Sequence, residues 1–300
     1  MDPLCRLITL LLLTDGQDFQ RAQEQSAREV CEREGFEFEV AYADNSPFMQ
    51  IQQALEYIDR PMNMRPAVIA VELASTPAAF TQVAKSALSV GIGWVELSSG
   101  VSAVDSLRHE YPGHLVATVT VDEDAIGELQ AAQCRALMPT GGTVLYVEGP
   151  NANPVVKTRR AALEKGLHAS SITIGKTICA DWTEEGATQA TLTWLQQASA
   201  SRIHPTLICS QNDAMALGVR KAARLKRTAW SGIPAIGCDG LTSVGQRYVK
   251  EGTLAATVVK PVTAGPAIEW VMRRLKGEKL PRHLTLHPTS FPTLEQLTHA

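Results

Sequence analysis

Two short stretches decide the fold of this sequence: Ala-Val-Ile-Ala-Val at residues 67–71 and Val-Leu-Tyr-Val at residues 144–147. Both are continuously apolar and do not alternate with polar residues, which is typical of strands buried on both faces. On either side, similar apolar runs alternate with longer segments that have the periodicity of helices. Repeated strand–helix–strand units predict parallel sheets covered by helices, which is an α/β fold.

The predicted strands lie near residues 6–13, 36–42, 67–72, 92–97, 115–121, 142–147, 172–178, 206–210, 233–238 and 254–259. The predicted helices lie near residues 18–34, 48–59, 77–89, 123–138, 155–167, 184–198, 213–226, 241–251 and 262–276. Gly35, Gly166 and Gly252 stand where helices are expected to end. These strands exceed the eight of an α/β barrel, which favours two doubly wound sheets and leaves the barrel as the alternative.

The composition is that of a globular protein with more than one hydrophobic core. Of the 300 residues, 45% are hydrophobic and 20% charged, which excludes a largely disordered chain and a coiled coil. A single core rarely grows to this length, so two lobes are expected. The formal net charge of -3 predicts no nucleic-acid partner. No apolar run approaches the roughly 20 residues of a membrane span, so no membrane insertion is expected.

The six cysteines bear on the compartment. None forms a C-x-x-C unit, and Cys5, Cys209 and Cys238 lie inside apolar runs, so buried, reduced thiols are expected. The apolar run at residues 7–13 follows a single basic side chain, Arg6, and precedes no small-residue cleavage pattern, so it is interpreted as the first buried strand. These features predict a cytoplasmic location, and a periplasmic protein whose leader has been removed is the alternative.

Polar side chains gather just after the predicted strands, where parallel α/β sheets bind ligands. Asp, Asn, Gln and Ser predominate at these positions. Amides and carboxylates suit paired hydrogen bonds with vicinal hydroxyls, and an aromatic face can cover the apolar side of a sugar ring. The alternative interpretation of each such residue is a helix cap.

Catalytic signatures are missing from the sequence. It contains no G-x-S-x-G elbow, no H-E-x-x-H pair and no phosphate-binding loop. His283 and His287 are four residues apart, but prolines flank them, which argues against a shared helical metal face. We therefore expect no enzyme, no metal site and no cofactor.

Three segments in the second half carry a family resemblance. They read Gln-Asn-Asp-Ala-Met-Ala-Leu-Gly at residues 211–218, Ile-Gly-Cys-Asp-Gly at 236–240 and Gly-Thr-Leu-Ala-Ala-Thr-Val at 252–258. Their succession resembles the type I periplasmic sugar-binding proteins, particularly the ribose-binding branch, and the related effector domains of lac-repressor-type regulators. The resemblance implies two Rossmann-like lobes with parallel sheets, joined by a three-segment hinge, and a ligand held in the cleft between them. It decides against the barrel.

The implied lobes are not consecutive halves of the chain. The three crossings are expected near residues 117–121, 259–262 and 283–287. The N-terminal lobe then holds residues 1–118 plus 261–284, and the C-terminal lobe holds residues 119–260 plus 285–300.

The resemblance also implies ligand-binding residues. The family's sugar-clamping arginine corresponds to Arg159, and its stacking aromatic corresponds to Trp182. Asn212 and Asp239 match family positions that follow two strands, and Lys260 stands where the ribose branch often carries glutamine. The full set of expected ligand-binding residues is Gln17, Asp18, Phe19, Glu72, Ser98, Ser99, Asn153, Arg159, Trp182, Asn212, Asp239 and Lys260.

The N-terminal lobe departs from the family pattern. The usual Asn-Pro-Phe-Phe after the first strand reads Gln-Asp-Phe-Gln at residues 17–20, which keeps one ring of two. The usual Asp-Arg pair after the fourth strand reads Ser98-Ser99, and Glu72 replaces a small amide. A different polyol, a sugar derivative or a ligand with a cationic group is therefore expected in place of ribose, and the alternative is a pseudo-binding protein that holds nothing in this cleft.

The leading hypothesis is a non-enzymatic solute-binding protein that closes its cleft on a small polyhydroxylated ligand, a sugar or sugar derivative, for uptake or sensing. Its partner would be a permease or a sensor kinase. The alternative is an intracellular effector-binding regulatory module without a DNA-binding headpiece. A third hypothesis is an enzyme in which Asp239 and Asp213, or Asp18 and Glu72, form an acid/base pair.

Overall fold

The computed structural model describes residues 6–97, 101–151, 153–197 and 202–298, and the chain folds into two compact units. The first unit runs to Val121 and resumes over Val262–Leu286. The second unit comprises Asp122–Pro261 and continues from His287. The chain therefore passes from one unit to the other three times. The boundaries lie slightly later than expected from the sequence, because two of the strands that lead to them continue to Val121 and Leu286.

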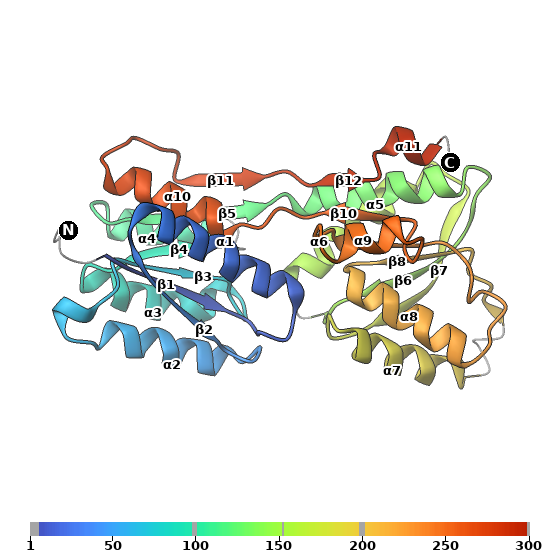
Figure 1. The fold of residues 1–300 in the computed structure, drawn as a ribbon, viewed down its shortest axis with the longest axis horizontal. Coiled ribbons are helices and arrows are strands. Elements are labelled where there is room, and N and C mark those ends of the chain that lie inside the picture. Colours follow the sequence, from blue (N-terminus) through green and yellow to red (C-terminus); the bar gives the residue numbers. More distant parts are fainter. Residues whose placement is uncertain (1–5, 98–100, 152, 198–201, 299–300) are drawn as a thin grey trace. The chain divides into compact units, whose positions relative to one another are not determined.

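The first unit is a six-stranded parallel sheet with helices on both faces (Figure 1). In sheet order, its strands are β11 (His283–Leu286), β5 (Val116–Val121), β4 (Gly93–Glu96), β3 (Val68–Val71), β1 (Leu7–Leu12) and β2 (Glu37–Tyr42). One face packs against α1 (Asp18–Glu34) and α10 (Ala264–Leu275). The other face packs against α2 (Pro47–Ile58), α3 (Pro77–Ser89) and α4 (Val101–Glu110), and a short 3-10 helix, η1 (Met62–Met64), precedes β3.

Strand β1 shows why its sequence is apolar at every position except Thr9. Ile8, Leu10 and Leu12 pack toward α1 and α10, whereas Leu11 packs toward α2 and α3. Side chains alternate between the two faces of a strand, and both faces of this strand are covered. Each such buried side chain contributes about 1.5–3 kcal/mol to folding.

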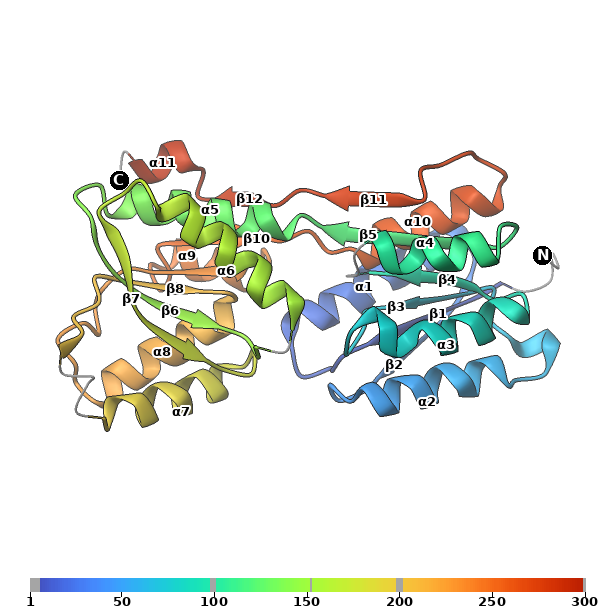
Figure 2. The same ribbon diagram turned by 180° about the vertical axis from the view of Figure 1, so that it is seen from behind.

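The second unit has the same plan with one exception (Figure 2). In sheet order, its strands are β12 (Thr289–Phe291), β10 (Ala256–Val259), β9 (Ala235–Asp239), β8 (Leu207–Ser210), β6 (Gly142–Glu148) and β7 (Ile172–Cys179), of which β12 runs antiparallel to β10. One face packs against α5 (Glu123–Leu137), α6 (Pro154–Leu167) and α11 (Leu294–Thr298). The other packs against α7 (Glu184–Leu195), α8 (Asp213–Leu225) and α9 (Gly245–Lys250).

Both sheets have a topological switch point at the same place in their strand order. In the first unit β1 lies between β2 and β3, and in the second unit β6 lies between β7 and β8. In the first unit, α1 follows β1 and α2 leads to β3, and these two helices cover opposite faces of the sheet. In the second unit, α6 follows β6 and α7 leads to β8, and they also cover opposite faces. In sheets of this kind, ligands bind beyond the carboxyl ends of the strands at the switch point.

The α/β expectation is confirmed, since all ten predicted strands are present and the sheets are parallel apart from β12. The described elements outside the predicted lists are short: α4, β11, β12, α11 and η1. Gly166 was expected to end a helix, and this expectation is wrong, because Gly166 lies inside α6. A Cβ at Gly166 would lie 2.5 Å from the Cβ of Ala131 in α5, so this glycine permits close packing of the two helices.

Gly127 in α5 makes a second close contact with α6 and predicts an unusual effect on stability. Alanine normally stabilises a helix by about 1 kcal/mol relative to glycine. A Cβ at Gly127 would lie 2.3 Å from the carbonyl oxygen of Arg159, so Gly127→Ala should instead lower the free energy of unfolding by about 1–3 kcal/mol. Urea denaturation measures this change.

Gly113→Ala is the matched control, because a Cβ at Gly113 would meet no atom within 4 Å. We expect its effect to stay within about 0.5 kcal/mol of zero. A Gly127→Ala variant as stable as the wild type would show that α5 and α6 do not pack as described.

Candidate functional site

Arg159 is the central charged residue of the second unit. It lies in α6, which begins at Pro154 after the cap residue Asn153, whose side-chain oxygen accepts a hydrogen bond from Val155 N at 3.0 Å. The Arg159 side chain is only 3% exposed. Its Nε donates to Glu123 Oε2 at 2.6 Å, and its Nη1 donates to the carbonyl oxygen of residue 211 at 2.9 Å.

These contacts fix the charge and the direction of the guanidinium group. Burial opposes the charge of Arg159, but the neighbouring Glu123 carboxylate outweighs burial and raises the arginine pKa. Nη2 forms no hydrogen bond with any residue that the structure describes. A rigid pair of N–H donors is suited to two neighbouring oxygen atoms.

Gln211 holds together the loops at the switch point of the second sheet. It follows β8 directly and is fully buried. Its Nε2 donates to Tyr146 Oη at 2.7 Å and to the Val156 carbonyl oxygen at 2.9 Å, and its Oε1 accepts from Gly149 N at 3.1 Å. The segments after β6 and β8 are therefore tied to each other and to α6.

Trp182 and Asn212 form one arrangement beside this switch point. Asn212 caps α8 through a hydrogen bond from Met215 N to its Oδ1 at 2.9 Å, and its Nδ2 donates to the Trp182 carbonyl oxygen at 2.8 Å. A Cβ at Gly149 would lie 2.1 Å from Trp182 Cζ2, so the indole lies directly against the Gly149 backbone. Asn212 thus positions Trp182 and retains one N–H on Nδ2.

Asp239 and Lys260 lie at the carboxyl ends of β9 and β10. Asp239 adopts a left-handed backbone with φ of 97°, and its carbonyl oxygen accepts from Lys260 N at 3.2 Å. The neighbouring Asp213 is 4% exposed, and its two oxygens accept from Thr257 Oγ1 at 2.7 Å and Gly240 N at 2.9 Å. Burial, followed by the nearby Asp239 charge, raises the Asp213 pKa well above its ordinary value. Asp213 is thus engaged in joining β9 to β10, which gives no support to an acid/base pair with Asp239.

In the first unit, the predicted residues after β1 differ in their surroundings. Gln17 precedes α1 without capping it through its side chain, and Phe19 is buried. Asp18 is exposed and forms an ion pair with Arg21 at 2.5 Å, which contributes little because both side chains are about half exposed. Ser98 and Ser99 lie outside the described residues.

Glu72 is the buried carboxylate of the first unit's switch point. It follows β3 directly and is 8% exposed. Its Oε2 accepts from Gln20 Nε2 at 3.1 Å and from Gln23 Nε2 at 3.3 Å. The sequence interpretation missed both glutamines, although they lie on the buried face of α1 between apolar residues, where a polar side chain needs a partner.

The described part of the chain contains neither a cluster of metal-ligating side chains nor a disulfide. Within it, no three His, Cys, Asp or Glu side chains are grouped to hold a metal ion. The cysteines described there are all free, with Cys179 exposed and Cys31, Cys134, Cys209 and Cys238 buried, while Cys5 lies outside the described residues. No described helix is long and apolar enough to cross a bilayer.

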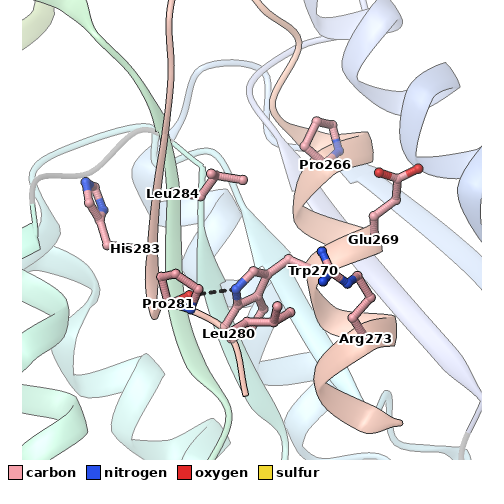
Figure 3. A pocket seen from close by; sticks show the side chains of 8 residues that line it. All are labelled: Pro266, Glu269, Trp270, Arg273, Leu280, Pro281, His283 and Leu284. Carbon is pink, nitrogen blue, oxygen red and sulfur yellow. Dashed lines mark hydrogen bonds between the residues drawn. The ribbon is translucent and has the colours of Figure 1, made fainter. Parts of the chain in front are cut away.

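Figure 3 shows a pocket of the first unit that is separate from these residues. It encloses about 190 Å³ and is lined by Pro266, Glu269, Trp270, Arg273, Leu280, Pro281, His283 and Leu284. The Trp270 indole donates to the Pro281 carbonyl oxygen at 2.7 Å, which fixes the base of the pocket (Figure 3). The pocket lies at the amino-terminal end of β11, away from the carboxyl ends of the strands, and is smaller than the roughly 300–1,000 Å³ of typical ligand sites.

A family model described as "Periplasmic binding protein domain" matches residues 8–279, and the chain belongs to this family. The match begins at the second residue of β1, takes in the elements up to α10, and ends before β11, β12 and α11. Among curated proteins, no sequence matches this chain.

Solved structures show the same fold. One is an ABC transporter periplasmic solute-binding protein from Actinobacillus succinogenes with bound D-allose, at 21% identity and a TM-score of 0.81, covering 98% of this chain and 99% of that chain. Another, from Bacillus halodurans with bound myo-inositol, has 17% identity, a TM-score of 0.81 and coverages of 100% and 98%. A third, the fructose-binding periplasmic domain of a hybrid two-component system, has 14% identity, a TM-score of 0.80 and coverages of 98% and 93%.

Asp213 predicts a specific dependence of stability on pH. Its pKa in the folded protein lies above the ordinary aspartate value of about 3.9. The folded state therefore keeps this proton where the unfolded state has released it, and the associated stability is lost as pH rises from about 4 through the raised pKa. Asp213→Asn removes the titration, so its free energy of unfolding relative to wild type should increase over that range.

Urea denaturation at a series of pH values measures this difference. Asp18→Asn makes the same charge change at an exposed position, and we expect its difference from wild type to be small. A pH-independent difference for Asp213→Asn would contradict the raised pKa.

Proposed function

We propose that the protein binds a small polyhydroxylated ligand, a sugar or a polyol, without changing it chemically. The observation that carries this proposal is the fixed Arg159 guanidinium, which Glu123 and the Gln211 carbonyl hold while its Nη2 donates to no described residue. The N–H groups of Nη2 suit neighbouring hydroxyl oxygens. The Trp182 indole, fixed by Asn212 and Gly149, offers an apolar face of the kind that covers a sugar ring.

Family membership supports this proposal. The similar structures described above hold D-allose and myo-inositol, and the family model is that of a binding domain. Asp213 and Asp18 are both engaged in contacts within the protein, so the acid/base alternatives receive no support from the geometry. Binding without turnover is therefore favoured over catalysis.

The proposal extends to a role in uptake or sensing. Two of the similar structures are components of ABC transporters, and a third is the periplasmic domain of a two-component system. A permease or a sensor kinase is accordingly the proposed partner. Hinge closure on the ligand, which the resemblance implies, should appear in small-angle X-ray scattering as a smaller radius of gyration when ligand is added.

The compartment is a separate proposal. The family description favours the periplasm, whereas the free cysteines favour a reducing compartment such as the cytoplasm. Fractionation of the native host with compartment markers decides between them. Genes for transporter subunits or for a kinase beside this one would distinguish uptake from sensing, and a regulator would favour the effector-module alternative.

A panel of sugars and polyols tests the proposed ligand class directly. A ligand that binds only the folded state stabilises it by RT ln(1 + [L]/Kd), about 2.7 kcal/mol at one hundred times Kd. We expect at least one panel member to raise the thermal unfolding midpoint by several degrees at saturation. Unchanged midpoints across the panel would contradict a sugar- or polyol-binding function.

Arg159→Lys tests the arginine on the best panel member. Lysine keeps a positive charge beside Glu123 but loses the planar pair of N–H donors. We expect ligand binding to weaken by about 1.5–3 kcal/mol in isothermal titration calorimetry.

Arg160→Lys is the matched control, because Arg160 pairs with Glu148 and Glu164 instead. Its affinity should equal that of the wild type. Equal affinity in Arg159→Lys would place the ligand elsewhere.

A further inference from the structure

Glu72 lies in the region of the first unit where sheets of this kind bind ligands. It comes directly after β3, next to β1, at the switch point of the sheet. Its backbone is fixed, since its N–H donates to the Leu11 carbonyl oxygen at 2.9 Å and its carbonyl oxygen accepts from Gln50 Nε2 at 2.8 Å. The side chain therefore starts from a rigid base.

One oxygen of this carboxylate is held by a prepared pair of amides. Oε2 accepts from Gln20 and Gln23. Gln20 is itself fixed, because its Oε1 accepts from Leu13 N at 3.1 Å. Because two N–H donors hold Oε2, the direction of the other oxygen, Oε1, is fixed as well.

Gln23 is fixed even more firmly than Gln20. Its Oε1 accepts from Thr263 N at 2.9 Å and from Ala264 N at 2.8 Å, and its Nε2 also donates to Thr263 Oγ1 at 2.9 Å. The beginning of α10 thus holds the amide that holds Glu72. Side chains arranged in this way around one carboxylate are characteristic of a preorganised binding group.

The second oxygen, Oε1, has no such partner among the residues that the structure describes. No described residue donates a hydrogen bond to it, and no described Lys or Arg forms an ion pair with Glu72. Oε1 is also not among the side-chain atoms that are sealed from solvent without a partner. By contrast, the Asp18 carboxylate, which follows the neighbouring strand β1, is exposed and already paired with Arg21.

A buried carboxylate without a positive partner is costly, and neutral amides compensate it only in part. A hydroxyl group could donate to Oε1 but would leave the negative charge unbalanced. An ammonium group supplies both the N–H donors and the positive charge, since it donates three hydrogen bonds and accepts none. The chemistry at Oε1 therefore favours a cation.

We infer that the ligand carries a protonated amino group that binds Glu72 Oε1, which makes an amino sugar or an amino polyol the substrate class. This inference rests on the proposed binding function and assigns the charged contact to the first unit.

Paired probes test the inference without any mutation. Isothermal titration calorimetry compares D-glucosamine with D-glucose and N-acetyl-D-glucosamine, and D-galactosamine with D-galactose and N-acetyl-D-galactosamine. At least one free amine should bind at least tenfold more tightly than its hydroxyl parent and its uncharged N-acetyl derivative. Parents that bind as tightly as the amines would overturn the inference and leave the proposed function standing. Absence of binding by every probe and by the wider panel would overturn both.

Glu72→Gln locates the preference at this residue. The amide keeps the size of the side chain but removes the charge, so the amine should lose at least tenfold in affinity while the hydroxyl parent changes little. Glu37→Gln removes a carboxylate charge from an exposed position at the amino-terminal end of β2 and should keep the preference. An amine preference that survives in Glu72→Gln would assign it to another group, and if this variant fails to fold, the paired probes on the wild type decide.

Discussion

At the carboxyl ends of the buried parallel strands, the polar groups of the backbone need hydrogen-bond partners inside the protein. Backbone N–H and C=O groups in these regions are shielded from water, so each must find a partner within the protein. Buried glutamines supply many of these partners. Gln50 joins the Glu72 carbonyl oxygen to Ala74 N, Gln130 donates to the Ser210 carbonyl oxygen, and Gln133 donates to that of Thr257. A side-chain amide suits this task because it donates and accepts without bringing a charge into the core.

The same contacts that satisfy the fold also prepare the candidate site. Gln211 ties the loops after β6 and β8, and its own carbonyl oxygen directs Arg159. Gln20 and Gln23 fill the corresponding region of the first unit and direct Glu72. Arg159 in the second unit and Glu72 in the first are thus both charged groups that neighbouring side chains hold in place. Such groups lose little freedom when they bind, which is how preorganisation raises affinity.

Individual residues show how far the sequence predicts the molecule. The strand over residues 68–71 was predictable because burial on both faces of a parallel sheet requires an unbroken apolar run. The helix over residues 101–110 was missed, because it is short and its apolar positions are few. Gly166 was misread as a helix end, since glycine serves both helix termination and close helix packing, and one sequence does not distinguish the two uses.

For the candidate site, the sequence placed Glu72 and Trp182 just after predicted strands, and the family resemblance added Arg159. What each of these side chains is free to do depends on the packing of the folded chain. Arg159 shares its guanidinium with Glu123, a residue 36 positions earlier, and Glu72 depends on glutamines some 50 positions away. The periodicity of a sequence reports which face of an element is buried, because burial is a local property of the pattern. Which donor meets which acceptor is settled by the packing of elements distant in the chain, and local patterns carry no record of it.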